Sequence, residues 1–338
     1  METTFTDVSQ PRKDDLEPAV TVATTARLHF GFFDPSGRTS RPFGSFGLAL
    51  DRPWTRLTLQ HAREEAFSGP EADRAARYLR AIAEAQGLDK AYRLDISEAI
   101  PSHAGLGSGT QLALAVGAAF AALEELDLSP PDIARLLGRG ARSGIGIATF
   151  ETGGAVLDSG PRNGALPQLV ARVPFPPSWR TLLIFDPETK GLDGEDEVAA
   201  FEASPAYSED ARAALEARIV ERALPALETG EFGVFCDEVG YLQARMGDYF
   251  APRQGGIYTS PRVGAVLGAL RAAGVSGLGQ SSWGPTGFAF AQSETEAQHL
   301  LRVASDADAD RALQMLVAKG RNEGAEITHA RTAATGRA

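Results

Sequence analysis

The sequence contains few cysteines and fewer positive than negative charges, and both features exclude some compartments and partners. Its single cysteine, Cys236, cannot form an internal disulfide, which predicts a protein of a reducing compartment such as the cytoplasm. Aspartate and glutamate outnumber lysine and arginine by 44 to 33, which gives a formal net charge of −11. A chain with this charge is repelled by nucleic acids and by anionic membrane surfaces, so neither is an expected partner.

Long hydrophobic runs and several familiar catalytic motifs are also missing. No apolar stretch approaches the roughly 20 residues needed to cross a bilayer, and the polar first residues predict a tail rather than a secretory leader. The sequence has no Walker lysine, no CxxC pair, no GxSxG turn and no metalloprotease helix. A hydrophobic content of 43% is ordinary for a globular protein, and 338 residues suffice for two domains.

Glycine, by contrast, is abundant and gathers in three stretches. The clearest lies at Pro101–Thr110, between an alternating apolar stretch that predicts a strand and a periodic run over 112–126 that predicts a helix. Glycine in front of a helix lets a phosphate approach the free backbone amides closely. A lone loop of this kind is often only a tight connection, so the other two stretches, at 138–154 and 274–292, bear on its interpretation.

The rest of the sequence mixes strand and helix patterns without regular alternation, which predicts an α+β fold. Clustered prolines at 173–179 mark the best candidate for a linker, because proline interrupts both kinds of regular structure. We therefore expect the following division: a tail at 1–18, an N-terminal domain with the phosphate loop at 19–175, a C-terminal α+β domain at 180–330, and a tail at 331–338.

Four stretches of the sequence stand in a specific order: RLHFGFFDPSGRTSRPFGSFGLALDRP, GLGSGTQLALAVG, RSGIGIATFETGGAVLDSG and GQSSWGPT. Together they resemble the motifs of the GHMP kinase superfamily and, within it, those of the β-ribofuranosylaminobenzene 5'-phosphate synthase family. The resemblance covers most of the chain from about residue 21 onward. It implies a two-domain GHMP-kinase-like α+β fold with the active-site cleft between the domains, and a homodimer.

The resemblance also implies a reaction. The family condenses phosphoribosyl diphosphate with 4-aminobenzoate or 4-hydroxybenzoate and releases carbon dioxide and diphosphate, within tetrahydromethanopterin biosynthesis. Both benzoates carry a para donor and one carboxylate, so the sequence leaves the choice of acceptor open. Mg²⁺ is the expected cofactor because it suits phosphate and carboxylate oxygens, whereas neither ATP nor an organic cofactor is expected.

One departure separates the sequence from the kinases of the superfamily. Many of them place a catalytic aspartate directly after a Ser-Gly-hydrophobic sequence. Here the Ser-Gly-Ile at 143–145 is followed by Gly146, which can neither orient nor deprotonate an alcohol. The first loop also reads Ser-Gly-Thr at 108–110 where kinases usually carry paired serines. An ATP-dependent small-molecule kinase and a non-catalytic sugar-phosphate sensor remain the alternative functions.

The motifs supply the candidate binding residues. The phosphate loop contributes Gly105, Leu106, Gly107, Ser108, Gly109 and Thr110. Arg27, in the first motif, is expected to grip a phosphate or the benzoate carboxylate, because guanidinium binds either group bidentately. The other glycine-rich stretches contribute Arg142 (expected at the 5-phosphate), Ser143, Gly144, Ser281 and Ser282. Ordinary turn chemistry is the alternative for the two last serines.

Three further side chains are candidates for chemistry. His29 alternates with Arg27 on one face of the first motif strand, and is expected either to bond a ribose hydroxyl, to act as an acid, or to be a packed core histidine. Asp34 and Asp158 are the carboxylates closest to motif glycines, and are candidate Mg²⁺ ligands or positioning groups. A structural turn is the competing interpretation for both aspartates. The acidic run at 195–197 is interpreted as a solvated helix start.

Overall fold

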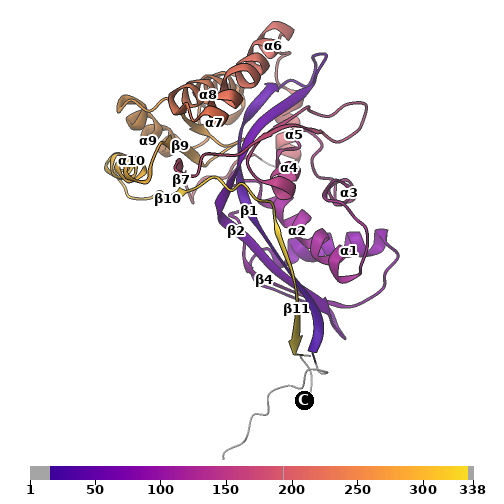
Figure 1. Cartoon of the computed structure of the whole chain (residues 1–338). Coiled ribbons are helices and arrows are strands. Elements are labelled where there is room, and N and C mark those ends of the chain that lie inside the picture. The colour runs from indigo at the N-terminus through magenta and orange to yellow at the C-terminus, as the bar shows by residue number, and fades with distance from the viewer. Residues whose placement is uncertain (1–15, 193, 334–338) are drawn as a thin grey trace, which may run out of the picture.

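The computed structural model describes residues 16–192 and 194–333 (Figure 1). They form two α+β units, which confirms the predicted fold class, one around a seven-stranded sheet and one around a four-stranded sheet. The strands of the first sheet are β1 (Leu16–Asp34), β2 (Phe43–His61), β3 (Ala66–Ser68), β4 (Tyr92–Glu98), β5 (Ala155–Asp158), β6 (Leu169–Val173) and β11 (Glu326–Ala333). Their path runs β11-β1-β2-β4-β3, and β5 joins β2 to β6.

Helices cover one side of the first sheet (Figure 1). They are α1 (Ala72–Ala85), α2 (Ser108–Leu123), α3 (Pro130–Leu136) and α4 (Ile145–Thr152). The α2 helix is apolar on nearly all of its faces, so it is buried between the sheet and the neighbouring helices, where it forms the centre of this core. Its N-terminus, which follows the first glycine loop as predicted, is thereby held in one position.

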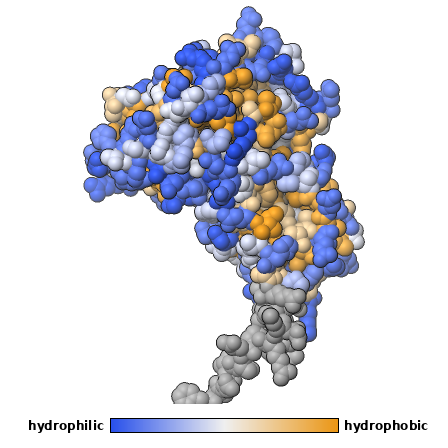
Figure 2. Space-filling model, viewed as in Figure 1, coloured by the Kyte–Doolittle hydropathy of each residue, from blue (hydrophilic) through white to orange (hydrophobic). Residues whose placement is uncertain are grey.

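The second sheet has the order β10-β7-β9-β8. Its strands are β7 (Arg180–Phe185), β8 (Leu278–Gln280), β9 (Gly287–Ala291) and β10 (Gln314–Ala318). Two amphipathic helices, α9 (Pro261–Ala272) and α10 (Glu294–Ala307), pack on it, and the surface over them in Figure 2 is mostly hydrophilic. The remaining helices are α5 (Gly194–Glu202), α6 (Glu209–Arg218), a π-helical turn (Ile219–Ala223), α7 (Leu224–Thr229) and α8 (Phe232–Gln254).

An aromatic core joins the two domains. Phe30, on β1, lies 5.5 Å from Phe288 and 5.7 Å from Phe290, measured between ring centroids, and both of those rings belong to β9. Phe235, on α8, lies 5.1 Å from Phe290. All of these rings are buried. Because such a core is densely packed, it holds the facing surfaces of the two domains in a defined geometry.

The predicted domain limits need correction at the C-terminal end. The strand β11 does not belong to the second domain but pairs antiparallel with β1, with Val20 opposite His329 (Figure 1). The predicted C-terminal domain therefore ends before 326, and residues 331–333 belong to a strand rather than a tail. Residues 174–179 of the predicted linker lie between β6 and β7, and Val173 is the last residue of β6. The rest of the predicted tails, 1–15 and 334–338, lies outside the described residues.

Across the described segments, no helix combines the length and the apolar character that crossing a bilayer requires.

Candidate active site

The predicted motifs meet through hydrogen bonds between distant parts of the chain. The carbonyl oxygen of Gly105 accepts from Arg27 Nη1 at 2.6 Å and from Ser281 Oγ at 2.8 Å. The same hydroxyl of Ser281 accepts from the backbone N–H of His29 at 3.0 Å. The first strand, the first glycine loop and the third glycine-rich stretch therefore form one cluster, at the boundary between the two domains.

Two glycines of the loop have geometrical reasons to be glycine. Gly105 and Gly107 have φ angles of +76° and +80°, which side chains with a Cβ rarely adopt. A Cβ at Gly105 would collide with the carbonyl oxygen of Ser281 and lie 2.9 Å from that of Gly284. A Cβ at Gly107 would lie 3.1 Å from Arg27 Nε. The loop thus packs directly on backbone of the second domain and on an arginine of the first.

A cavity of about 300 Å³ opens at this cluster, between the domains as predicted; we call it the loop cavity. Its floor is the backbone of Gly105 and of 107–110, and Ser282–Gly284 line it from the second domain. Arg27, Arg74 and Arg139 also line it, together with the carboxylate of Glu197. In a chain with a net charge of −11, this local excess of positive charge is suited to an anion.

The start of α2 leaves backbone donors facing the loop cavity. Gly107 is the N-cap residue and carries no side chain that accepts from the first amides of the helix. Ser108 and Thr110 add hydroxyl groups to the same lining. Leu106, which the motif also suggested, is instead buried in the core and contributes only its carbonyl, which accepts from the Arg27 backbone N–H at 3.1 Å.

Arg27 is a partly buried cation whose guanidinium has a donor without a partner. Burial lowers the pKa of Arg27 to about 10, and the charge of Glu197 opposes this effect, so the guanidinium stays protonated at neutral pH. Its Nε is buried without a hydrogen-bond partner among the described residues. An unpaired buried donor is costly. The arrangement therefore favours an anion in the loop cavity.

His29 does not have the properties of an acid. Burial, aided by the positive charge of Arg27, lowers the pKa of His29 to about 3, so its ring is neutral at physiological pH. The ring lies 4.5 Å from that of Phe32 and lines a separate cavity of only about 30 Å³. Neither ring nitrogen has a hydrogen-bond partner in the described part of the chain. The structure favours a packed histidine over the predicted acid.

We expect His29→Phe to remove a pH dependence of stability. The folded pKa lies below the ordinary value of about 6.5, so the unfolded state binds more protons between pH 6.5 and 3. Wild-type stability should fall by about 1.4 kcal/mol per pH unit through this term as the pH drops over that range. The free energies of urea unfolding of the two proteins should be similar at pH 7 and differ by about 2 kcal/mol at pH 5. Parallel pH profiles would contradict the assignment.

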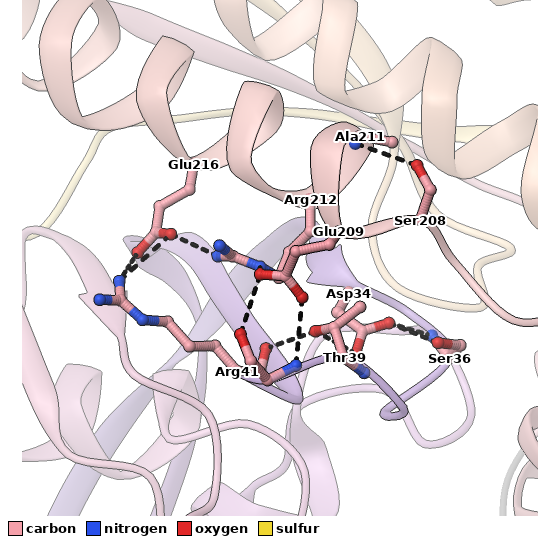
Figure 3. Close-up of polar contacts among 10 residues, drawn as sticks. Asp34, Ser36, Thr39, Arg41, Ser208, Glu209, Ala211, Arg212 and Glu216 are labelled. Carbon is pink, nitrogen blue, oxygen red and sulfur yellow. Dashed lines mark hydrogen bonds and ion pairs between the residues drawn. The ribbon is translucent and has the colours of Figure 1, made fainter.

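Asp34 is a turn residue and not part of the loop cavity (Figure 3). One carboxylate oxygen accepts from the backbone N–H and hydroxyl of Ser36, at 2.9 and 2.6 Å. The other accepts from the same two groups of Thr39, both at 2.9 Å. The loop that Asp34 shapes is then held by α6, where Ser40 Oγ donates to Glu209 at 2.9 Å. These contacts favour the structural-turn alternative for Asp34 over the predicted catalytic or metal-binding role.

Asp158 also accepts hydrogen bonds from groups within the protein, which favours the structural alternative over the predicted role as a metal ligand. Its carboxylate accepts from the hydroxyl and backbone N–H of Ser45, from the hydroxyl of Ser143, and from the backbone N–H groups of Gly144 and Gly160. Burial raises the pKa of Asp158, and these hydrogen bonds oppose the rise. Ser143 and Gly144 thus bind Asp158 at the start of α4 and do not line the loop cavity. The described residues contain no group of three or more His, Cys, Asp or Glu placed to hold a metal ion.

Arg142, which was predicted to bind the 5-phosphate, instead contacts residues of α5. Its guanidinium lies 4.7 Å from the ring centroid of Phe201, and its Nη1 lies 3.4 Å from Glu197 Oε2. Both partners belong to α5, so Arg142 anchors that helix over the site. Of the two predicted serines, Ser281 is wholly buried in the hydrogen-bonded cluster, and only Ser282 lines the loop cavity.

Gly146 and Thr110, at which the sequence departs from the kinase pattern, lie close together. A Cβ added at Gly146 would lie 2.8 Å from the methyl carbon of Thr110. The carbonyl oxygen of Gly146 accepts from Gln111 Nε2 at 2.8 Å, which fixes its position against α2. A side chain at position 146 would therefore have to displace Thr110.

The basic residues Arg74 and Arg139 were missed by the sequence reasoning. Arg74 lies in α1, outside every motif, whereas Arg139 follows α3 and lies in the second glycine-rich stretch, at 138–154, where it was not singled out. The one available signal was the spacing of three between Arg74 and Arg77, which puts both on one face of a helix; such charged pairs are common on solvated faces. His103, in the loop itself, was also missed; its φ angle of +57° is unusual for a residue other than glycine.

Solved structures define the class of this fold. The chain superposes on homoserine kinase from Cytophaga hutchinsonii with a TM-score of 0.65 and 16% identity, over 97% of this chain and 100% of that one. Mevalonate diphosphate decarboxylase from Staphylococcus aureus gives a TM-score of 0.65 and 14% identity, over 93% and 99%. The models of the GHMP kinases N terminal domain and of the GHMP kinases C terminal region match 72–154 and 223–320. The fold is therefore that of the GHMP kinases.

Sequence relatives place the chain more closely. A β-ribofuranosylphenol 5'-phosphate synthase from Archaeoglobus fulgidus is 32% identical over 326 residues, covering 90% of this chain and 98% of the relative. A protein of the same name from Methanothermobacter thermautotrophicus is 28% identical, covering 78% and 86%. The chain belongs to the β-ribofuranosylphenol 5'-phosphate synthase family of the GHMP kinase superfamily, which confirms the predicted resemblance.

Proposed function

We propose that the protein transfers ribose 5-phosphate from phosphoribosyl diphosphate to a 4-substituted benzoate and releases carbon dioxide and diphosphate. The observation that supports this most is the loop cavity, where a glycine loop, a helix N-terminus and the partly buried Arg27 converge. The relatives are named for a ribosylated phenol. Loss of the carboxylate from 4-hydroxybenzoate leaves a phenol, so this name favours 4-hydroxybenzoate over 4-aminobenzoate as the acceptor.

The proposed reaction is a substitution at C1 of the ribose. The bond from C1 to the diphosphate oxygen breaks, its electron pair leaves with diphosphate, and positive charge spreads over C1 and the ring oxygen. The acceptor carbon that bears the carboxylate attacks C1. The bond to the carboxylate then breaks, its electron pair restores the aromatic ring, and carbon dioxide departs. No proton has to leave that ring carbon.

The loop cavity supplies the groups that a diphosphate leaving group needs. A helix terminus contributes only about 0.3–1 kcal/mol, up to ~2 when partly buried, which is too little for so many negative charges. Arg27 adds a partly buried cation whose buried Nε has no hydrogen-bond partner among the described residues. Mg²⁺ commonly binds through substrate phosphates and one or two carboxylates, and Glu197 is a carboxylate in this lining. When bound, the ion neutralises charge that develops on diphosphate.

A neighbouring cavity of about 550 Å³ has room for the acceptor. It lies between the domains and shares His103 with the loop cavity. Phe185, Met315 and Leu316 give it apolar walls that suit an aromatic ring. Lys190 supplies a cation for the benzoate carboxylate, beside the carboxylate of Asp186, which also lines the cavity. A ring held there would be shielded from water next to the diphosphate.

The proposal is tested by incubating the protein with phosphoribosyl diphosphate, Mg²⁺ and carboxyl-labelled 4-hydroxybenzoate or 4-aminobenzoate. We expect labelled carbon dioxide and diphosphate in a one-to-one ratio, with a C-riboside identified by mass. A riboside that keeps its carboxylate, joined through oxygen or nitrogen, would rule out this mechanism. The homodimer stays a prediction, to be checked by sedimentation.

We expect no phosphoryl transfer from ATP, because Gly146 lacks a base and a side chain there would have to displace Thr110. ADP formation should stay at the background of a protein-free control with Mg²⁺, ATP and a panel of small alcohols such as homoserine. Gly146→Asp should not create kinase activity, since its side chain would displace Thr110. Turnover-dependent ADP release by the wild type would restore the kinase alternative.

A further inference from the structure

A second basic cavity continues the loop cavity away from the domain interface. It has a volume of about 770 Å³ and is lined by Arg77 and Tyr78, and also by Arg74, His103 and Arg139. The last three residues line the loop cavity as well, so the two cavities adjoin. We call the set of Arg74, Arg77, Tyr78 and Arg139 the arginine pocket.

Two guanidinium groups of this pocket converge on one acceptor. The hydroxyl of Tyr78 accepts from Arg74 Nε at 3.0 Å and also from Arg139 Nη2. The same ring lies under both guanidinium groups, with centroid distances of 6.0 Å for Arg74 and 5.2 Å for Arg139. Two like charges gathered on a neutral hydroxyl repel each other, and a bound anion relieves this repulsion.

The three arginines of this lining outnumber its two carboxylates, Glu71 and Asp73. The carboxylate of Glu71 lies 3.6 Å from Arg74, longer than a direct hydrogen bond. Arg139 Nε is buried without a hydrogen-bond partner among the described residues. A Cβ at Gly109 would collide with the Arg74 guanidinium, so this arginine lies directly over the first turn of α2. The positive charge of the pocket is therefore continuous with the glycine loop.

We propose that the arginine pocket binds the phosphomonoester end of a phosphorylated sugar while the glycine loop holds its diphosphate end. This inference rests on the proposed function, because phosphoribosyl diphosphate is a ligand with two such ends. Guanidinium groups are well matched to phosphate oxygens. Arg142, the residue that the sequence suggested for this role, is engaged by Glu197 and Phe201.

The test is calorimetric titration of the full chain with ribose 5-phosphate and, separately, with inorganic diphosphate and Mg²⁺. Arg77→Gln and Arg139→Gln should each weaken ribose 5-phosphate binding about tenfold or more. Arg77 does not line the loop cavity, so Arg77→Gln should change diphosphate binding less than about threefold. The matched control is Arg80→Gln, on the same helix but paired with Glu65, which should leave both affinities unchanged.

Two results would overturn the inference: a wild-type protein that does not bind ribose 5-phosphate, or pocket variants that bind it like Arg80→Gln. Selective loss of ribose 5-phosphate binding supports it even if no riboside forms from any benzoate. In that case the pocket assignment stands and the proposed function fails, so the two are distinguished. Thermal unfolding of each variant separates a lost contact from a lost fold.

Discussion

Arg27→Ala is expected to lower kcat/KM by about 10²–10³-fold, with equal losses in the release of diphosphate and of carbon dioxide. The side chain is partly buried, lines the loop cavity and donates to the Gly105 carbonyl oxygen at 2.6 Å. Removing one preorganised donor to charge that develops in the transition state costs about 2.7–4 kcal/mol, and each 1.36 kcal/mol is tenfold in rate. Both products can be followed in one assay with carboxyl-labelled acceptor and a coupled diphosphate measurement.

Measuring diphosphate and carbon dioxide separately distinguishes a role of Arg27 in the departure of diphosphate from a role in a later step of the reaction. Arg27→Lys keeps the charge but not the planar fork, so its activity should lie between those of the wild type and Arg27→Ala. Arg80→Ala, an exposed arginine outside the cavity, serves as the control and should retain full activity. If Arg27→Ala released diphosphate normally while carbon dioxide release fell, the assignment of Arg27 to the leaving group would be wrong.

Gly105→Ala is expected to lower the free energy of unfolding by about 2–5 kcal/mol and to abolish diphosphate binding. About 1–2 kcal/mol comes from forcing a Cβ into the left-handed region, and about 1–3 kcal/mol from overpacking. The colliding atoms are carbonyl oxygens of Ser281 and Gly284, which are backbone and cannot rotate away. Urea unfolding gives the first quantity and calorimetry with diphosphate and Mg²⁺ gives the second.

Gly87→Ala is the matched control for this substitution. Gly87 also has a positive φ angle, +67°, but a Cβ there meets no atom within 4 Å among the described residues. It should therefore cost only the conformational term of about 1–2 kcal/mol. Equal losses in the two variants would show that the close approach of the second domain to Gly105 has no energetic consequence.

The parts of the fold that were predictable depend on short-range signals. The strand, glycine loop and helix around Pro101–Thr110 could be predicted because periodicity, proline and glycine act on neighbouring residues. The linker at 173–179 was predictable for the same reason. The strand β11 was not placed correctly, because its pairing with β1 joins residues about 300 positions apart and its sequence, EITHARTA, carries no sign of which sheet it extends.

The candidate site was predicted in part. Arg27, the loop glycines and Ser282 line the loop cavity as expected, because motif residues are concentrated where backbone must approach a ligand. Asp34 and Asp158 stood beside motif glycines, yet both are bound by internal donors. For Asp158 one donor is Ser45, 113 residues away in the sequence. Proximity to a motif does not reveal such a partner.

By itself the sequence determined the α+β class, the phosphate-binding type of loop and the absence of a catalytic aspartate at Gly146, since each depends on residue type and local spacing. Only the tertiary structure decided which polar groups face the loop cavity and which form hydrogen bonds within turns. It alone brought Arg74 and Arg139 together on Tyr78 beside the loop. The physical reason is that a side chain's charge and donors are set by its residue type, whereas whether they remain available depends on what the folded chain places against them.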